Sequence, residues 1–303
     1  MVRAADEAPS APPPRSRLAV VRLLRPKQWA KNLLVFAAPA AAGVLDNGEE
    51  LSKSLVAFVA FCLAASGTYC LNDARDAEAD RQHPTKRHRP VASGHVGEGL
   101  ARQLGVVLLA AGGAVTLLVD NLWLFASVAG YVVMMTAYTH GLKRVAVVDL
   151  AVVASGFIVR ALAGAAATEV PVSDWFLIVT SFGSLFMVAG KRSSEFEEAD
   201  DPGAHREVLG EYSLDFLHMV RSVSAGVTLL AYTLFAFERA DLARATVPWF
   251  ELSIVPFVLA ILRYALRADQ GGGSAPEEIV LGDRPLQVLG ALWLALFALG
   301  VYV

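Results

Sequence analysis

The chain has 303 residues, of which 55% are hydrophobic and 18% are charged, and its formal net charge at pH 7 is −3. Its apolar stretches are mostly about 18–22 residues long, the length that crosses a lipid bilayer as a helix. A soluble protein of this size does not need nine such stretches in its core, so the composition excludes a soluble fold. We therefore expect an all-α integral membrane protein in which residues 18–303 form one domain, with no nucleic-acid partner.

The predicted elements begin with a tail, residues 1–17, which is rich in Ala and Pro and is expected to be disordered. Residues 18–31 combine Val, Leu and Trp29 with four basic residues, as an interfacial amphipathic helix does. Nine apolar segments then predict transmembrane helices, with the bounds 33–46, 52–71, 100–119, 121–139, 146–167, 174–190, 216–237, 247–266 and 286–303.

Basic residues are concentrated at one end of these predicted helices. They occur in the N-terminal segment and after the second, fourth, sixth and eighth helices, whereas the loops at the other end contain only Lys53, Arg239 and Arg244. Because cytoplasmic segments of membrane proteins carry an excess of Lys and Arg, we place the basic end in the cytoplasm. The expected location is the inner (plasma) membrane, with a cavity in the helix bundle that opens to the cytoplasm.

A carboxylate cluster, residues 72–80, directly follows the second apolar segment. If the helix continues, Asn72, Asp76 and Asp80 share one face, and Asp73 lies one turn before Asp76. Several oxygen ligands on one stripe suit Mg²⁺, which binds through a few carboxylates plus substrate phosphates. A solvated acidic helix end is the simpler interpretation, but the basic run 86–89 follows at once, so acid and base together predict a phosphate held by a metal ion.

Polar residues inside the fifth predicted helix suggest a second contribution to the cavity. Asp149 and Arg160 are eleven residues apart, about three turns, and so face the same way. An arginine near the bilayer interior needs an anionic partner; Arg160 either forms a structural Asp–Arg pair across helices or faces an anionic ligand. Gly156 and Gly164 flank it and would allow a neighbouring helix to approach closely.

The helix pattern and the spacing Asn72-Asp73-x-x-Asp76-x-x-x-Asp80 resemble the UbiA-type intramembrane prenyltransferases. Members of that family hold a diphosphate through Mg²⁺ on two Asp-rich loops, after the second and sixth helices. The first motif is complete in this chain. The second is not, because Lys191-Arg192-Ser193-Ser194-Glu195 stands where aromatic prenyltransferases have D-x-x-x-D.

Longer stretches are similar to one branch of that family. They are residues 25–32, Tyr69 with Asn72-Asp73, residues 83–87 and residues 182–192. This branch uses phosphoribosyl diphosphate as donor and decaprenyl phosphate as acceptor, and its product feeds arabinan synthesis in the cell wall. A homo-oligomer such as a trimer is compatible with the resemblance, although no residue pattern requires it.

The resemblance assigns roles to particular residues. Asn72, Asp73, Asp76 and Asp80 would hold Mg²⁺, with Asp73 and Asp76 as the catalytic residues. The expected substrate-binding residues are Asn72 and Tyr69 near the donor, Lys31, Lys143 or Arg160 on the acceptor phosphate, and Lys86, Arg87, Arg89, Lys191 and Arg192 on the donor phosphates. Tyr69 could instead only pack, and the cations at 191–192 could instead only enforce topology.

Two other functions are compatible with part of the pattern. An aromatic prenyltransferase would need a second acidic pair, which residues 191–195 do not supply. A polytopic transporter could use the carboxylates as a cation site, but transporters often have internal repeats and polar residues at the middle of the membrane. No convincing repeat is present, and the charges gather at one end, so phosphoribosyl transfer is the favoured function.

Overall fold

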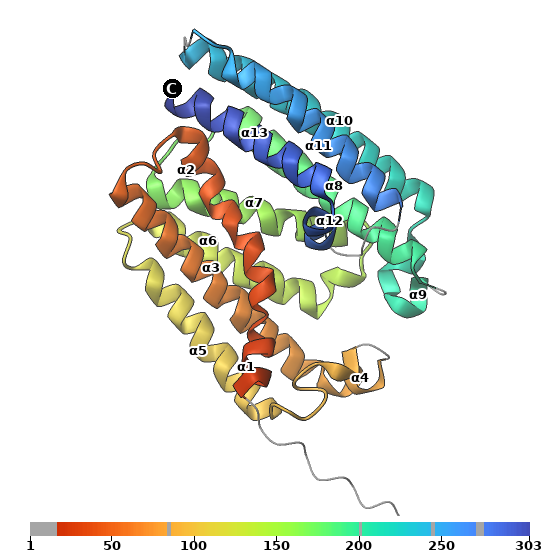
Figure 1. Ribbon diagram of the computed structural model, residues 1–303. Coiled ribbons are helices and arrows are strands. Elements are labelled where there is room, and N and C mark those ends of the chain that lie inside the picture. The colour runs from red at the N-terminus through yellow and green to blue at the C-terminus, as the bar shows by residue number, and fades with distance from the viewer. Residues whose placement is uncertain (1–16, 84–85, 200–201, 244–245, 271–275) are drawn as a thin grey trace, which may run out of the picture.

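The structure is a computed structural model that describes residues 17–83, 86–199, 202–243, 246–270 and 276–303. Within these ranges every regular element is a helix and no strand occurs, which confirms the all-α prediction (Figure 1). The predicted tail lies outside the described residues, except for its last residue.

Long helices run back and forth along the bundle. They are α3 (Gly48–Arg75), α5 (Glu98–Thr116), α6 (Leu122–His140), α7 (Val148–Thr168), α8 (Asp174–Glu197), α10 (Leu214–Ala243), α11 (Trp249–Asp269) and α13 (Arg284–Tyr302). The shorter elements are α1 (Arg17–Leu24), η1 (Pro26–Phe36), α2 (Ala37–Ala42), α4 (Ala77–Gln82), η2 (Lys86–His88), η3 (Leu142–Arg144), α9 (Pro202–His205), η4 (Glu207–Glu211) and α12 (Pro276–Gly282).

Seven helices of the described chain are long and apolar enough to cross a membrane: α3, α5, α6, α7, α10 over Leu214–Leu242, α11 and α13. They coincide with seven of the nine predicted spans, so the chain is an integral membrane protein. The predicted spans 33–46 and 174–190 are not among them. Residues 174–190 are helical within α8, but Asp174 and Lys191 closely bound the apolar part of that helix.

The N-terminal segment is not the single interfacial helix expected over residues 18–31. Helix α1 ends at Leu24, and Arg25 adopts a left-handed backbone conformation with φ 53° before Pro26. The break follows from Pro26, which has no N–H group and disfavours a helical conformation for the residue before it. A 3₁₀ helix, η1, and the short α2 continue the chain from there.

This same stretch explains why the first expected span is not a long α-helix. Eleven residues of 3₁₀ helix rise about 2.0 Å each and six residues of α-helix about 1.5 Å each, which gives about 31 Å in all. That length is close to the thickness of the hydrocarbon core of a bilayer. In Figure 1 the segment runs from α1, beside α4, to α2 at the opposite end of the bundle.

The 3₁₀ segment packs tightly against α7 because of one glycine. A Cβ atom on Gly164 would lie 1.7 Å from the carbonyl oxygen of Val35, so any larger residue would push η1 away. The predicted role of Gly164 in close approach is therefore confirmed. Val35 also belongs to a buried cluster with Phe61, Leu124 and Tyr131, which joins η1 to α3 and α6.

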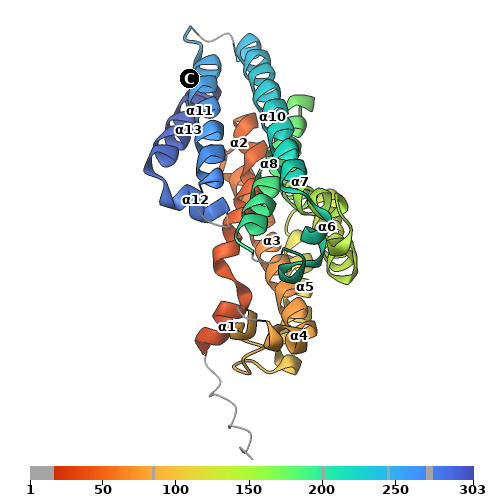
Figure 2. The same cartoon turned by 90° about the vertical axis from the view of Figure 1, so that its right-hand side faces the viewer.

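Helix ends divide the molecule into two opposite regions. The ends of α3, α6 and α8, together with the start of α10, lie toward α1, α4 and α9 (Figure 1). Figure 2 shows again that α1 and α4 lie at the same end of α3. The connections α2–α3, α7–α8 and α10–α11 lie at the other end. The predicted site residues 72–89 and 143 therefore belong to the α4 end.

Candidate active site

The helix that carries the carboxylates bends where the motif begins. Helix α3 ends at Arg75, Asp76 takes a non-helical conformation (φ −89°, ψ 7°), and α4 starts at Ala77. Backbone hydrogen bonds still link Asp76 N to the Asn72 carbonyl at 2.9 Å and Asp80 N to the Asp76 carbonyl at 2.8 Å. The uninterrupted helix expected through Asp80 is thus wrong, although the spacing of one turn survives.

Two arginines gather the carboxylates into a group that we call the Asp73 cluster: Arg25, Asp73, Asp80 and Arg89. Arg25 Nη2 donates to Asp73 Oδ1 at 2.7 Å. Arg89 Nη1 lies 2.8 Å from Asp80 Oδ2 and 3.4 Å from Asp73 Oδ1, so it bridges the two acids. The guanidinium of Arg25 also stacks over the ring of Tyr69, 4.6 Å from its centroid.

One oxygen of the Asp73 cluster remains unsatisfied. The Asp73 side chain is only 2% exposed, and its Oδ2 atom is buried without a hydrogen-bond partner among the described residues. A buried carboxylate oxygen left unpaired is costly. Such an atom is therefore a good candidate for a metal ligand.

Further cations surround the exposed side of the Asp73 cluster. Lys143 Nζ lies 3.9 Å from Asp76 Oδ2, and both side chains are about one-third exposed. Burial lowers the pKa of the half-buried Lys86 ammonium, and the positive charges of Arg89, Arg206 and Lys143 lower that pKa further. Residues from four separate segments thus contribute positive charge to one region.

The carboxylates of Asp73 and Asp76 are the type of ligand that Mg²⁺ prefers, but they do not form a complete coordination shell. Within the described ranges, no three His, Cys, Asp or Glu side chains are close enough to share a metal ion. Mg²⁺ commonly uses only one or two carboxylates and takes its other ligands from water and substrate phosphates. The orphan Oδ2 of Asp73 and the half-buried carboxylate of Asp76 can supply those two.

A second group of charges, the Asp149 cluster, consists of Tyr138, Asp149, Arg192, Glu195 and Arg206. Asp149 is 0% exposed and accepts from Arg192 Nε at 2.8 Å, Arg206 Nη2 at 2.9 Å and the Tyr138 hydroxyl at 2.6 Å. Arg192, 3% exposed, also donates through Nη1 to Glu195 Oε2 at 2.7 Å. Every charge at the centre of this cluster therefore has an opposite partner.

The Asp149 cluster decides one alternative about Arg160. A structural Asp–Arg pair across helices does occur, but Asp149 of α7 forms it with Arg192 of α8, and no carboxylate pairs with Arg160 within the described residues. The shared helix face expected from the eleven-residue spacing does not make the two side chains neighbours, because eleven residues of α-helix separate them by about 16 Å along the axis.

Neutral groups hold Arg160 there. Its Nε donates to Asn32 Oδ1 at 2.7 Å, its Nη2 to the Tyr131 hydroxyl at 3.1 Å, and its Nη1 to the Gly156 carbonyl. The Gly156 carbonyl thus serves as an acceptor, and an added Cβ on this glycine would make only ordinary contacts. A role for Arg160 toward an anionic ligand stays a prediction.

The remaining predicted residues fall into different surroundings. Lys31 donates to the Gln28 side chain, and Lys191 lies 3.7 Å from Glu195. Arg87 is exposed and points to its neighbour His88 rather than to the Asp73 cluster. The structure therefore brings Asp73, Asp76, Asp80, Lys86, Arg89 and Lys143 together, places Tyr69 beside them, and leaves Arg87 outside.

Residues 33–278, most of the chain, match the model of the UbiA prenyltransferase family. The chain belongs to this family. Two relatives named decaprenyl-phosphate phosphoribosyltransferase are similar over nearly their whole length: the protein of Mycobacterium tuberculosis is 47% identical over 96% of both chains, and that of Mycolicibacterium smegmatis is 44% identical over 98% of this chain and 97% of its own. The resemblance predicted from the sequence is confirmed.

The solved structures agree with this membership at the level of the fold. A UbiA homologue from Archaeoglobus fulgidus, solved with GPP and Mg²⁺, has a TM-score of 0.72 and covers 94% of this chain and 100% of its own. At 16% identity the likeness shows that both have the UbiA fold, and no more.

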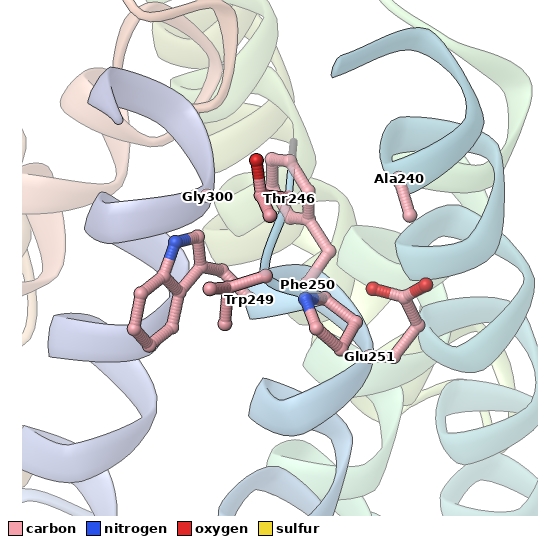
Figure 3. A pocket seen from close by; sticks show the side chains of 8 residues that line it. Ala240, Thr246, Trp249, Phe250, Glu251 and Gly300 are labelled. Atoms are coloured by element: carbon pink, nitrogen blue, oxygen red, sulfur yellow. The ribbon is translucent and has the colours of Figure 1, made fainter. Parts of the chain in front are cut away.

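Two cavities of this UbiA protein lie at the end opposite the carboxylates. One of about 370 Å³ is lined by residues of α2, α8 and α10, including Arg239. A smaller one is lined by Trp249, Phe250 and Glu251, whose carboxylate points toward Ala240 (Figure 3). Neither cavity has the Asp73 cluster in its lining, so the predicted cytoplasmic cavity stays a prediction.

Sequence reasoning missed several partners in this UbiA site. Arg25 lies in the N-terminal stretch that carries the family resemblance, and its position before Pro26 was the available signal. Arg206 and Tyr138 gave none, because they lie 57 and 11 residues from Asp149 in sequence and belong to a loop and an apolar helix. Asn32, the partner of Arg160, likewise had only its place in the N-terminal stretch.

Proposed function

We propose that this UbiA protein transfers the 5-phosphoribosyl group of phosphoribosyl diphosphate to decaprenyl (polyprenyl) phosphate. The reaction releases diphosphate and forms decaprenylphosphoryl-ribose 5-phosphate, a precursor for cell-wall arabinan. The observation that carries this proposal is Arg192, which stands in the second carboxylate motif and is tied to Asp149. The names of the two full-length relatives support the same activity.

The balance of charge at the α4 end suits such a donor. Phosphoribosyl diphosphate carries a diphosphate on C1 and another phosphate on C5, so it is more anionic than a prenyl diphosphate. The side chains around the Asp73 cluster include four cations, Arg25, Lys86, Arg89 and Lys143, and three carboxylates, Asp73, Asp76 and Asp80. The excess of positive charge favours the binding of the additional phosphate.

The bound donor would be held first by the carboxylate end. Asp73 and Asp76 would hold Mg²⁺, with Asn72 and Asp80 as further candidate ligands, and the ion would stabilise the negative charge of the departing diphosphate. Arg25 and Arg89, which contact Asp73 and Asp80, would also contact the diphosphate oxygens. Asp73 and Asp80 in turn hold both guanidinium groups in place, so the site is pre-organised.

The acceptor requires little from the protein except position. A lipid phosphate is already ionised near neutral pH, so its attack on C1 needs no general base. C1 acquires oxocarbenium character as the diphosphate leaves, as at a glycosidic centre. Lys143, close to Asp76, is the candidate for aligning the acceptor phosphate that the geometry favours, while Lys31 and Arg160 remain alternatives.

We also propose nine membrane crossings with the α4 end in the cytoplasm. The seven long apolar helices are joined by α8 and by the segment η1–α2, whose length matches a bilayer. The basic residues at the α4 end support this orientation in the inner membrane. A homotrimer stays a prediction.

The competing function is an aromatic prenyltransferase, because fold neighbours are solved with prenyl diphosphates such as GPP. The test is to incubate the purified protein, Mg²⁺ and lipid acceptors with labelled phosphoribosyl diphosphate, and separately with a labelled prenyl diphosphate. We expect label in lipid-linked product only from phosphoribosyl diphosphate. Transfer of the prenyl group alone would contradict the proposal, and Mg²⁺-dependent turnover in detergent without a gradient would exclude a transporter.

A further inference from the structure

The segment 206–212, which contains η4, is docked against the start of α7 at both of its ends. Arg206, just before η4, donates to Asp149, and Tyr212, just after η4, accepts a hydrogen bond from Val147 N at 2.8 Å. Between them Val208 and Leu209 are fully buried against Leu150 and its neighbours. The backbone that carries Arg206 is therefore fixed by packing as well as by charge.

The backbone at the start of α7 is strained where this segment docks. Val147 has φ 66° and ψ −44°, and Val148 N donates to the Ala146 carbonyl at 2.8 Å across it. This is a γ-turn with a positive φ, a rare and strained conformation that is especially unfavourable for a β-branched residue. Such strain persists only where the surroundings hold it. Here it turns the chain so that Asp149, two residues later, enters the interior.

The two arginines of the Asp149 cluster are held in different ways. Arg192 is 3% exposed and uses Nε, Nη1 and Nη2 on Asp149 and Glu195. Arg206 is 28% exposed, and its contacts with Asp149 and Tyr138 both use Nη2. Its Nε and Nη1 have no hydrogen-bond partner in the part of the chain that the structure describes.

The charges of this region leave a positive excess at its exposed side. Asp149 and Glu195 face three cations, Lys191, Arg192 and Arg206. Arg206 also lies toward the Asp73 cluster, because η4, which directly follows it, packs against η3, and Lys143 of η3 lies 3.9 Å from Asp76 Oδ2. Because Arg192 is paired with two carboxylates and is only 3% exposed, the accessible guanidinium of this cluster belongs to Arg206.

We propose that Asp149 is a positioning residue that holds Arg206 at the exposed side of the Asp149 cluster, so that the Nε and Nη1 groups of Arg206 bind the 5-phosphate of the ribose donor. This inference rests on the proposed function and names the subsite that distinguishes this donor from a prenyl diphosphate. On the proposed function the diphosphate end of the donor binds at the Asp73 cluster, so the remaining phosphate is the ligand for a cation outside that cluster. Arg192 then acts only through Asp149 and does not bind the donor.

The test uses two fragments of the donor as separate probes. Binding of ribose 5-phosphate, and of diphosphate with Mg²⁺, is measured by calorimetry on the detergent-purified full chain. For Arg206→Met we expect the Kd of ribose 5-phosphate to rise about tenfold or more, as for the loss of a charge-assisted hydrogen bond. The Kd of diphosphate should change by less than about threefold. Arg206→Lys should recover part of the loss, and Arg144→Met, an exposed arginine of the same region, is the matched control that should bind as the wild type.

Asp149 is tested through its effect on Arg206. Asp149→Asn should weaken the binding of ribose 5-phosphate as much as Arg206→Met does. The double variant should have the same Kd as the single variants, because both substitutions remove the same contribution to binding. Tyr138→Phe keeps the carboxylate and should give a smaller loss in the same direction, so the inference can be tested even if Asp149→Asn does not fold.

Three outcomes would be decisive. If Asp149→Asn and Tyr138→Phe lower only the thermal midpoint and leave the Kd of ribose 5-phosphate unchanged, Asp149 is structural and the inference is wrong. If both variants weaken the binding of diphosphate instead of ribose 5-phosphate, the subsite is misassigned and the inference is wrong. If the wild type binds neither ribose 5-phosphate nor phosphoribosyl diphosphate, the proposed function itself has failed.

Discussion

The Asp73 cluster and the Asp149 cluster are built from the same types of side chain but differ in which of their polar atoms lack a partner. Both hold arginines against buried carboxylates at the same end of the bundle. Among the residues that the structure describes, a carboxylate oxygen of the Asp73 cluster has no partner. In the Asp149 cluster the carboxylate receives four hydrogen bonds, and the Arg206 guanidinium has described partners only at Nη2. The unsatisfied atom is an acceptor in the first and a donor in the second.

This difference indicates what each cluster can bind. A spare buried oxygen suits a cation, and a spare guanidinium suits an anion. A donor with a metal-bound diphosphate at one end and a phosphate at the other presents both kinds of partner. If the proposed 5-phosphate subsite is correct, this comparison gives a reason why Arg192 can stand where aromatic prenyltransferases have the second Asp-rich motif: it fixes Asp149, which in turn holds Arg206.

The largest effect is expected at the Asp73 cluster. Asp73→Ala should lower turnover about a thousandfold or more, because the substitution removes both the proposed oxygen ligand of the metal and the carboxylate partner of Arg25. Turnover is measured with labelled phosphoribosyl diphosphate at saturating Mg²⁺. Glu78→Ala, which removes an exposed acid of the same segment, is the control and should retain activity; retained turnover in Asp73→Ala would remove the metal role.

Substitutions in the Asp149 cluster should instead lower the free energy of unfolding. Arg192→Met leaves Asp149 buried with one of its two arginines, and breaking a buried pair costs about 3–5 kcal/mol. Lys143→Met, which breaks the one-third-exposed pair with Asp76 beside the Asp73 cluster, should cost about 1 kcal/mol or less. Thermal unfolding of both variants in the same detergent compares the two. A stable Arg192→Met protein that has lost donor binding would show that Arg192 is a ligand after all.

Much of this arrangement was predictable, and the limits have physical causes. Hydropathy located seven spans correctly because helix length and bilayer thickness are directly linked. The motif at residues 72–80 located the acids, and Pro26 carried a signal for the break at Arg25. The partner of Asp149 was not predictable, because helical phase fixes the face on which a residue lies but not which distant helix or loop covers that face.

The smallest effect tests how the segment 206–212 is docked. Tyr212→Phe removes the acceptor for Val147 N and should lower the free energy of unfolding by about 1–2 kcal/mol. Turnover should fall only modestly, since Arg206 keeps its contacts with Asp149. Unfolding and turnover are measured on the same preparation. A large loss of activity with unchanged stability would mean that Tyr212 itself contacts the substrate.

The most direct test of the account is a structure of the full chain with Mg²⁺ and phosphoribosyl diphosphate. We predict an ion about 2.1 Å from Asp73 Oδ2, the usual distance for a Mg²⁺ ligand, with the diphosphate bound to it and the 5-phosphate beside Arg206. An ion bound at another place would contradict the account. So would a donor whose diphosphate contacts Arg192 while Asp73 Oδ2 binds no ion.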